Sequence, residues 1–88
     1  MRRRVVYHGR VQGVGFRATA RRIANAVSVS GWVRNEPDGS VMMEVQGSAG
    51  QIEECLQGIA DAMGRNIRSC DWLDVPEQQP EPGFEVRS

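Results

Sequence analysis

Two segments with helical apolar spacing most constrain this chain, because within only 88 residues both must bury their apolar stripes in one small core. In residues 16–27 apolar side chains recur at helical intervals, and arginines fill the opposite face. In residues 48–64 a capping box of Ser48 and Gln51 precedes a single apolar stripe that ends at Gly64. The sequence therefore predicts two helices.

Strand-like segments surround the two predicted helices. Residues 29–34 and 41–46 alternate apolar and polar side chains on either side of the turn residues 37–39, which predicts a hairpin. Less regular strand patterns occupy residues 5–8, 67–75 and 84–87. Residues 76–82 are predicted to be a loop. The order is βαββαβ, followed by at most one more strand. Two helices can cover only one face of the sheet, which predicts an α+β fold: a two-layer ferredoxin-like sandwich with a four- to five-stranded, mostly antiparallel sheet.

Size and composition predict a single domain over residues 1–88. Hydrophobic residues make up 40% and charged residues 25%, a balance typical of globular proteins. No apolar run approaches the roughly 20 residues that span a bilayer, and no export signal is visible, so we expect a cytoplasmic protein that does not enter membranes. Cys55 and Cys70 have no Cys or His neighbour at ligand spacing. We expect no disulfide and no metal, and both thiols packed as small apolar residues.

The charges are balanced in number but not in position. Eleven basic and eleven acidic residues give zero net charge, so the broad positive field of a nucleic-acid-binding domain is missing. Residues 1–35 nevertheless contain eight arginines and no acidic residue. We therefore expect no nucleic-acid partner, but a small anion would be attracted to the N-terminal half.

A glycine-rich segment joins the first strand to the first helix: Gly9-Arg10-Val11-Gln12-Gly13-Val14-Gly15-Phe16-Arg17. Its glycines permit positive φ angles, and the following helix adds unpaired N–H groups at its start. Such a loop is typical of an anion nest, although a tight strand-to-helix turn would need the same glycines. The motifs Gly-x-x-x-x-Gly-Lys-Ser/Thr and Gly-x-Gly-x-x-Gly are absent, which argues against nucleotide binding by those two routes.

Arg17 and Asn35 are the candidate catalytic residues. A cation in the first helical turn is unfavourable for the helix dipole, whereas a guanidinium at that position can bind a phosphate bidentately. Asn35 follows a predicted strand beside a turn, where it is either a turn residue or, through its amide donor and acceptor, a group that holds a water. The other arginines of this helix, Arg21 and Arg22, fit a solvated face.

The 9–17 segment, followed by Gly31-Trp32-Val33-Arg34-Asn35 and by Asp38-Gly39, resembles the acylphosphatase family. The similarity is strong over residues 9–47, and residues 83–87 also resemble the last strand of the family. The resemblance implies a ferredoxin-like fold, in agreement with the predicted βαββαβ order. It also implies an acylphosphatase, which hydrolyses the carboxyl-phosphate anhydride of an acyl phosphate to carboxylate and inorganic phosphate.

The resemblance further implies roles for individual residues. Backbone N–H groups of the loop, with the Arg17 guanidinium, would cradle the substrate phosphate, and Asn35 would position the attacking water. The implied phosphate-binding residues are Gln12, Gly13, Val14, Gly15, Phe16 and Arg17. No metal and no cofactor are implied. The expected partner is a small-molecule acyl phosphate, bound by a monomer.

The chain departs from the family pattern at four places. Ser28 follows the first helix where relatives commonly have glycine, so we expect a left-handed serine that costs up to about 1 kcal/mol of stability. Ala20 stands where relatives often have a hydroxyl residue. Glu36 adds a negative charge beside Asn35, which would disfavour a dianion there. Residues 67–82 do not follow the family closely.

The remaining candidate residues are given structural roles. His8 has no partner visible in the sequence and is predicted to be an ordinary strand residue. Trp32 and Trp72 are predicted to be packing residues. Residues 2–4, all arginines, are predicted to form a solvated arm and the edge of the first strand, with contact to an anionic surface as the alternative.

Two other functions are compatible with a fold of this class. One is a binding module for RNA or a small effector, but the clustered strand aromatics of RNA-recognition sheets are missing. The other is an acylphosphatase-like module of a larger carbamoyl-transfer maturation enzyme. The short chain without zinc-binding cysteine pairs favours a free-standing enzyme over that module.

Overall fold

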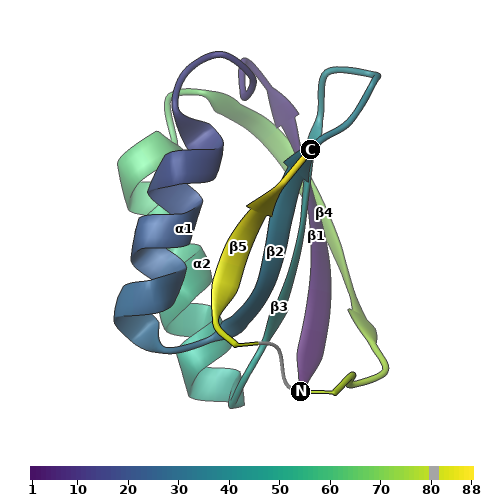
Figure 1. Cartoon of the computed structure of the whole chain (residues 1–88). Helices are drawn as coiled ribbons and strands as arrows, with labels where there is room; N and C mark the ends of the chain where they lie inside the picture. Colours follow the sequence, from purple (N-terminus) through teal and green to yellow (C-terminus); the bar gives the residue numbers. More distant parts are fainter. Residues whose placement is uncertain (80–81) are drawn as a thin grey trace.

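The computed structural model describes residues 1–79 and 82–88, which form a five-stranded sheet and two helices (Figure 1). Along the chain the elements are β1 (Arg2–Gly9), α1 (Phe16–Val27), β2 (Ser30–Asn35), β3 (Val41–Gln46), α2 (Ala49–Met63), β4 (Ile67–Val75) and β5 (Phe84–Arg87). The strands lie in the order β4-β1-β3-β2-β5, and only the β2–β5 pair is parallel. Both helices cover the same face of the sheet, which confirms the predicted two-layer α+β sandwich (Figure 1).

Except for β1, which begins three residues earlier than predicted, the elements begin and end close to the predicted residues. The predicted capping box at the start of α2 is confirmed, because Ser48 Oγ accepts a hydrogen bond from Gln51 N at 3.1 Å and Gln51 Oε1 accepts one from Ser48 N at 2.9 Å. The predicted loop over residues 76–82 includes residues 80 and 81, which lie outside the described residues. The part of the chain that the structure describes contains the helices α1 and α2, and neither is long and apolar enough to cross a membrane.

The core lies between the helices and the three central strands. Its buried side chains include Phe16, Ala20, Ile23 and Ala24 of α1, Ile52, Cys55, Ile59 and Met63 of α2, and Val5, Tyr7, Val33, Val41, Met43 and Val45 of the strands. Removing this apolar surface from water is the main stabilising contribution to the fold. Because α1 also packs along β2 and β5, its first turn is held at a fixed place relative to the ends of those strands.

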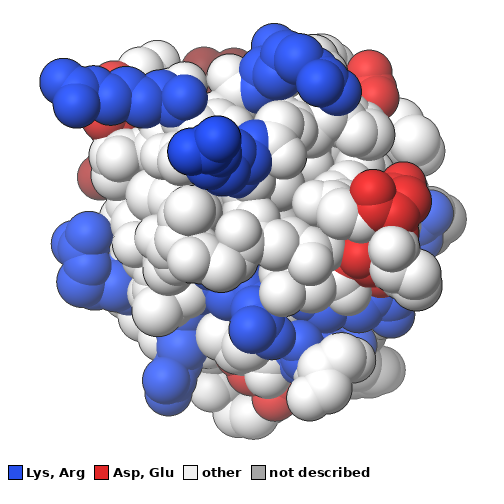
Figure 2. All heavy atoms as spheres, turned by 90° about the horizontal axis from the view of Figure 1, so that it is seen from above, with Lys and Arg blue, Asp and Glu red and all other residues white. Residues whose placement is uncertain are grey.

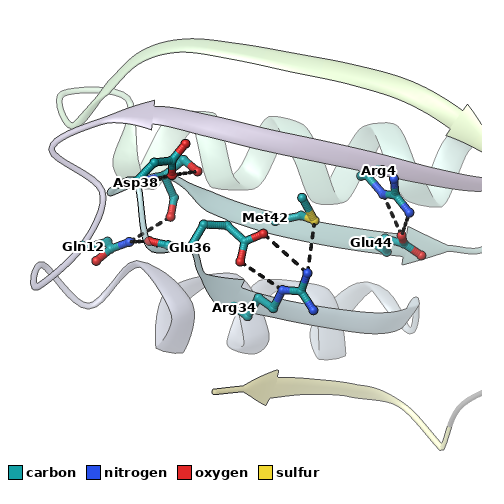
Figure 3. A network of polar contacts seen from close by, with 8 residues as sticks. Arg4, Gln12, Arg34, Glu36, Asp38, Met42 and Glu44 are labelled. Atoms are coloured by element: carbon teal, nitrogen blue, oxygen red, sulfur yellow. Dashed lines mark hydrogen bonds and ion pairs between the residues drawn. The ribbon is translucent and has the colours of Figure 1, made fainter.

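The other face of the sheet carries a buried ion-pair cluster. Arg2 Nε donates a hydrogen bond to Glu44 Oε1 at 2.7 Å. Figure 3 shows the second contact, in which Arg4 Nη2 lies 2.7 Å from Glu44 Oε2. The Arg2 side chain is fully buried. The prediction of a solvated arm is therefore wrong for Arg2, because β3 brings the Glu44 carboxylate against Arg2 and Arg4. Residues 2–4 all belong to β1.

Acid should destabilise the fold through Glu44. Burial favours a raised pKa for this carboxyl, but hydrogen bonds from Arg2 and Arg4 outweigh burial and hold its pKa below the ordinary value of 4.5. The cluster therefore contributes to the free energy of unfolding above about pH 4.5, and that contribution is lost as pH falls through the lower folded-state pKa. In urea titrations over this acid range, Glu44→Gln should lose less stability on acidification than the natural chain. Parallel losses in the two proteins would contradict this role of Glu44.

Two predicted packing residues of β4 are exposed instead. Trp72 is 56% exposed, and its ring lies beneath the Arg3 guanidinium at 3.9 Å from carbon to ring centroid. Cys70 is also exposed, whereas Cys55 and Trp32 are buried as predicted. Burial raises the pKa of the Cys55 thiol to about 11. The difference arises because β4 is an edge strand whose side chains are exposed along most of its length.

The end of α1 has the predicted left-handed serine. Ser28 has φ 66° and ψ 32°, and its N–H donates to Asn25 O at 3.2 Å. It is the non-glycine residue with positive φ in the described part of the chain. A side chain at such a position is strained, because Cβ crowds the following carbonyl oxygen.

Replacing Ser28 with glycine should relieve this strain. We expect Ser28→Gly to raise the free energy of unfolding by up to about 1 kcal/mol, because glycine adopts left-handed conformations without a steric penalty. For a domain of this size that gain raises Tm by about 4–8 °C. Calorimetry should show no comparable gain for Ser28→Ala, which keeps a Cβ at this position. An unchanged Tm in the glycine variant would mean that the serine conformation is not strained.

Candidate active site

The loop between β1 and α1 has the backbone of an anion nest. Gly13 and Gly15 have φ angles of 76° and 80°, as the sequence predicts. A Cβ atom built on either glycine would meet no other atom within 4 Å. The need for glycine is therefore conformational, and the space beside the loop is open. In Figure 1 this loop lies at the upper end of the molecule, directly before α1.

The start of α1 is left available to an anion. Gly15 is the N-cap residue and forms no side-chain cap, and the first turn contains no acidic residue. The N-terminal N–H groups and the helix dipole therefore present uncompensated positive charge toward the loop. The first turn is also firmly anchored, because the buried Phe16 ring packs 4.8 Å from the Tyr7 ring of β1. The anchored, uncapped turn suits an anion that needs fixed donors.

A cleft of about 340 Å³ brings the two candidate catalytic residues together. The half-buried Arg17 enters it from the first turn of α1, and the half-buried Asn35 enters it from the end of β2. Gly13, Gly15 and Phe16 also line this cleft. Of the other loop residues expected to bind phosphate, Gln12 and Val14 do not line it. Arg17 and Asn35, which are 18 positions apart in sequence, thus converge on one site because α1 packs against β2.

Gln12 ties the loop to the β2–β3 turn through its side chain. Its Nε2 donates hydrogen bonds to Glu36 O at 2.8 Å and to Ser40 O at 2.9 Å (Figure 3). The turn is itself closed by Asp38, whose Oδ1 accepts from Ser40 Oγ at 2.6 Å and from Ser40 N at 2.9 Å. These hydrogen bonds hold the pKa of Asp38 below its usual value. Since Asn35 directly precedes the turn, the Gln12 amide fixes the distance between the loop and Asn35.

Glu36 is held away from the cleft. Arg34 Nε donates to Glu36 Oε2 at 3.1 Å, and Arg34 Nη2 lies 3.4 Å from Glu36 Oε1 (Figure 3). Neither residue lines the cleft. The charge expected to disfavour a dianion beside Asn35 is therefore compensated by the guanidinium of Arg34 in β2.

Positive charge remains available in the cleft. In the part of the chain that the structure describes, Arg17 and Arg21 both line the cleft, and no carboxylate forms an ion pair with either. Figure 2 looks down on this end of the molecule, where blue basic side chains are spread around a largely uncharged surface and red acidic side chains lie toward its edges, with the largest group at the right. The arrangement favours binding of an anion over binding of a cation.

The cleft is also lined by four residues that the sequence did not suggest as site residues: Val11, Ala18, Arg21 and Val86. Arg21 was predicted to lie on a solvated face, and its side chain is indeed exposed, but it also borders the cleft. Its spacing of four from Arg17 is a usable signal, because residues at that interval share one helix face. Val86 carried no local signal, since β5 reaches the cleft only through its pairing with β2.

The only histidine lies elsewhere, as predicted. His8 belongs to β1, and its Nε2 lies 3.1 Å from Asp71 Oδ2 of β4. It does not line the cleft. Among residues 1–79 and 82–88, no group of three or more His, Cys, Asp or Glu side chains is placed to hold a metal ion.

Comparison with known proteins agrees with the motif resemblance. The family model described as acylphosphatase matches residues 3–86. An acylphosphatase from Salinibacter ruber is 42% identical over 83 residues, which cover 90% of this chain and 84% of that protein. A crystal structure of acylphosphatase from Bacillus subtilis has a TM-score of 0.88 at 22% identity and covers 99% of this chain and 98% of its own. Full-length HypF in its phosphate- and nucleotide-bound form has a TM-score of 0.81 at 23% identity, over 99% of this chain but 12% of HypF. The two structural likenesses show a shared fold.

Proposed function

The chain belongs to the acylphosphatase family, and we propose that it hydrolyses acyl phosphates in the cleft between the glycine-rich loop, α1 and the end of β2. The observation that carries this proposal is the convergence of Arg17, Asn35 and the uncapped start of α1 on one cleft. A guanidinium, a neutral amide and an array of backbone donors are suited to phosphoryl transfer, which depends mainly on positioning and charge stabilisation.

The phosphate group of the substrate is bound by the loop. Backbone N–H groups of the loop donate to its oxygens: those of Gly13, Gly15, Phe16 and Arg17, which line the cleft, and those of Gln12 and Val14, which adjoin them in the loop. The Arg17 guanidinium adds charge-assisted hydrogen bonds. Support comes from the left-handed glycines and from the helix start that lacks a side-chain cap. Donors fixed before the substrate binds stabilise the transition state without reorganising.

Asn35 holds the attacking water. Its amide offers both a donor and an acceptor, so it orients a water toward phosphorus without changing its own protonation state. The water oxygen forms a bond to phosphorus, and the bond from phosphorus to the acyl oxygen breaks. The electron pair leaves with the carboxylate, and a water proton passes to the phosphate. No side chain needs to titrate, so we expect turnover to vary little with pH around neutrality.

Hydrolysis of benzoyl phosphate by the purified chain, with EDTA present, tests the proposal. Turnover under these conditions is expected, because a carboxylate is a good leaving group and the proposed machinery contains no metal. Arg22→Ala is a matched control for loss of a helical arginine, because Arg22 does not line the cleft and should retain full turnover. A folded chain without turnover would contradict the proposal. Titration with inorganic phosphate would then show whether the loop is an anion site of a binding module.

A further inference from the structure

The cleft extends beyond the phosphate loop along α1. Its lining continues from Arg17 to Ala18 and Arg21 on the helix, and Val86 of β5 also borders it. Arg21 follows Arg17 by one helical turn, about 6 Å along the axis. A substrate whose phosphate occupies the loop can therefore place its acyl group along the helix, past Val86 and toward Arg21.

Arg21 differs from its neighbour Arg22 in what surrounds it. Both are exposed, but only Arg21 lines the cleft. No ion pair to a carboxylate is found for Arg21 in the described residues. Two like charges at this helical spacing repel each other and destabilise the helix slightly. An arginine pair with this cost and no compensating carboxylate is well suited to a ligand that carries two separated negative charges.

We propose that Arg21 is a specificity-determining residue that favours acyl phosphates whose acyl group carries a second negative charge. This inference rests on the proposed acylphosphatase function and names the class of its substrate. The loop and Arg17 bind the phosphate, while Arg21 binds a carboxylate or a second phosphate at the far end of the acyl group. The exposed apolar side chain of Val86 lies beside the part between the two charges.

The test compares substrates of nearly the same shape. The probes are 4-carboxybenzoyl phosphate and 4-carbamoylbenzoyl phosphate, with the 3-substituted pair alongside because an arginine side chain has several rotamers. The measured quantity is the ratio of kcat/KM for the carboxylate probe to kcat/KM for the amide probe, in the natural chain and in Arg21→Gln. Differences in intrinsic reactivity largely cancel when these ratios are compared. Arg22→Gln, which loses the same charge outside the cleft, controls for a general loss of positive potential.

We expect the carboxylate-to-amide ratio to fall about three- to five-fold in Arg21→Gln, mainly through KM, the size typical of one partly exposed ion pair. Arg21→Lys should restore part of the ratio, Arg22→Gln should leave it unchanged, and added salt should reduce the preference. An equal ratio in the natural chain and Arg21→Gln, with both probes hydrolysed, would overturn this inference and leave the proposed function standing. No turnover of any probe by the folded chain would overturn both.

Discussion

Replacing Arg17 with alanine is expected to lower kcat/KM for benzoyl phosphate by about 10³–10⁵-fold, the range by which an arginine that contacts the transferring phosphoryl group changes turnover. Arg17 lines the cleft at the start of α1, and no ion pair engages its guanidinium in the described part of the chain. Its charge is therefore available to the phosphate. Steady-state kinetics with the variant give the size of the loss.

The fold should survive this substitution. Alanine has the highest helix propensity and removes a cation from the positive end of the helix dipole, so Tm should not fall. Affinity for inorganic phosphate should weaken along with turnover, because the same guanidinium binds both ligands. Arg17→Lys keeps the charge but lacks the planar guanidinium, so its activity should lie between those of the natural chain and Arg17→Ala. If turnover in Arg17→Ala stayed within a few-fold of that in the natural chain, Arg17 would not be a phosphate-binding residue.

The fold is predictable where the pattern of each segment agrees with its packing. The apolar stripe of α1 and the capping box of α2 define both helices, and the alternation in β2 and β3 defines the hairpin. With only two helices in so short a chain, the single covered face of the sheet follows directly. Local propensity and tertiary packing point to the same structure in these segments.

The N-terminal arginines show where sequence patterns fail. Residues 2–4 are as polar as a solvated arm, yet they form the start of β1. The burial of Arg2 depends on Glu44, a residue 42 positions away whose partnership becomes visible only when β1 and β3 pair. A buried cation is tolerated when it is paired and hydrogen-bonded, and no local signal reveals such a partner.

The candidate site also contains residues that the sequence reveals and residues that it does not. Arg17 and the loop glycines can be recognised in the sequence as candidate site residues. A cation at a helix start and a left-handed backbone are both unfavourable for stability, which suggests a functional reason for them. The far end of the cleft cannot be recognised in this way. Val86 has the pattern of an ordinary strand residue, and it reaches the cleft only because β5 pairs with β2. Gln12 was predicted as a phosphate-binding residue of the loop, but its side-chain amide donates hydrogen bonds to the β2–β3 turn and does not line the cleft.

Replacing Asn35 with alanine should lower kcat by about 10²–10³-fold, the cost of removing one preorganised hydrogen-bonding group from a transition state. KM should change little, because the loop and Arg17 still bind the phosphate. Asn35 pairs with Val41 through the backbone ladder, and the turn beyond it is braced by Gln12 and Asp38, so the hairpin should persist without the amide. Steady-state kinetics beside thermal unfolding of the same variant measure both expectations.

Asn35→Asp provides the contrast that separates water positioning from shape. Aspartate has nearly the shape of asparagine and keeps an acceptor, but it loses the amide donor and adds a negative charge beside the phosphate. It should therefore lower kcat as alanine does and also raise KM, because two like charges in one cleft repel. Full kcat in Asn35→Ala would show that the loop and Arg17 alone align the water. A defect in KM alone would instead make Asn35 a phosphate ligand.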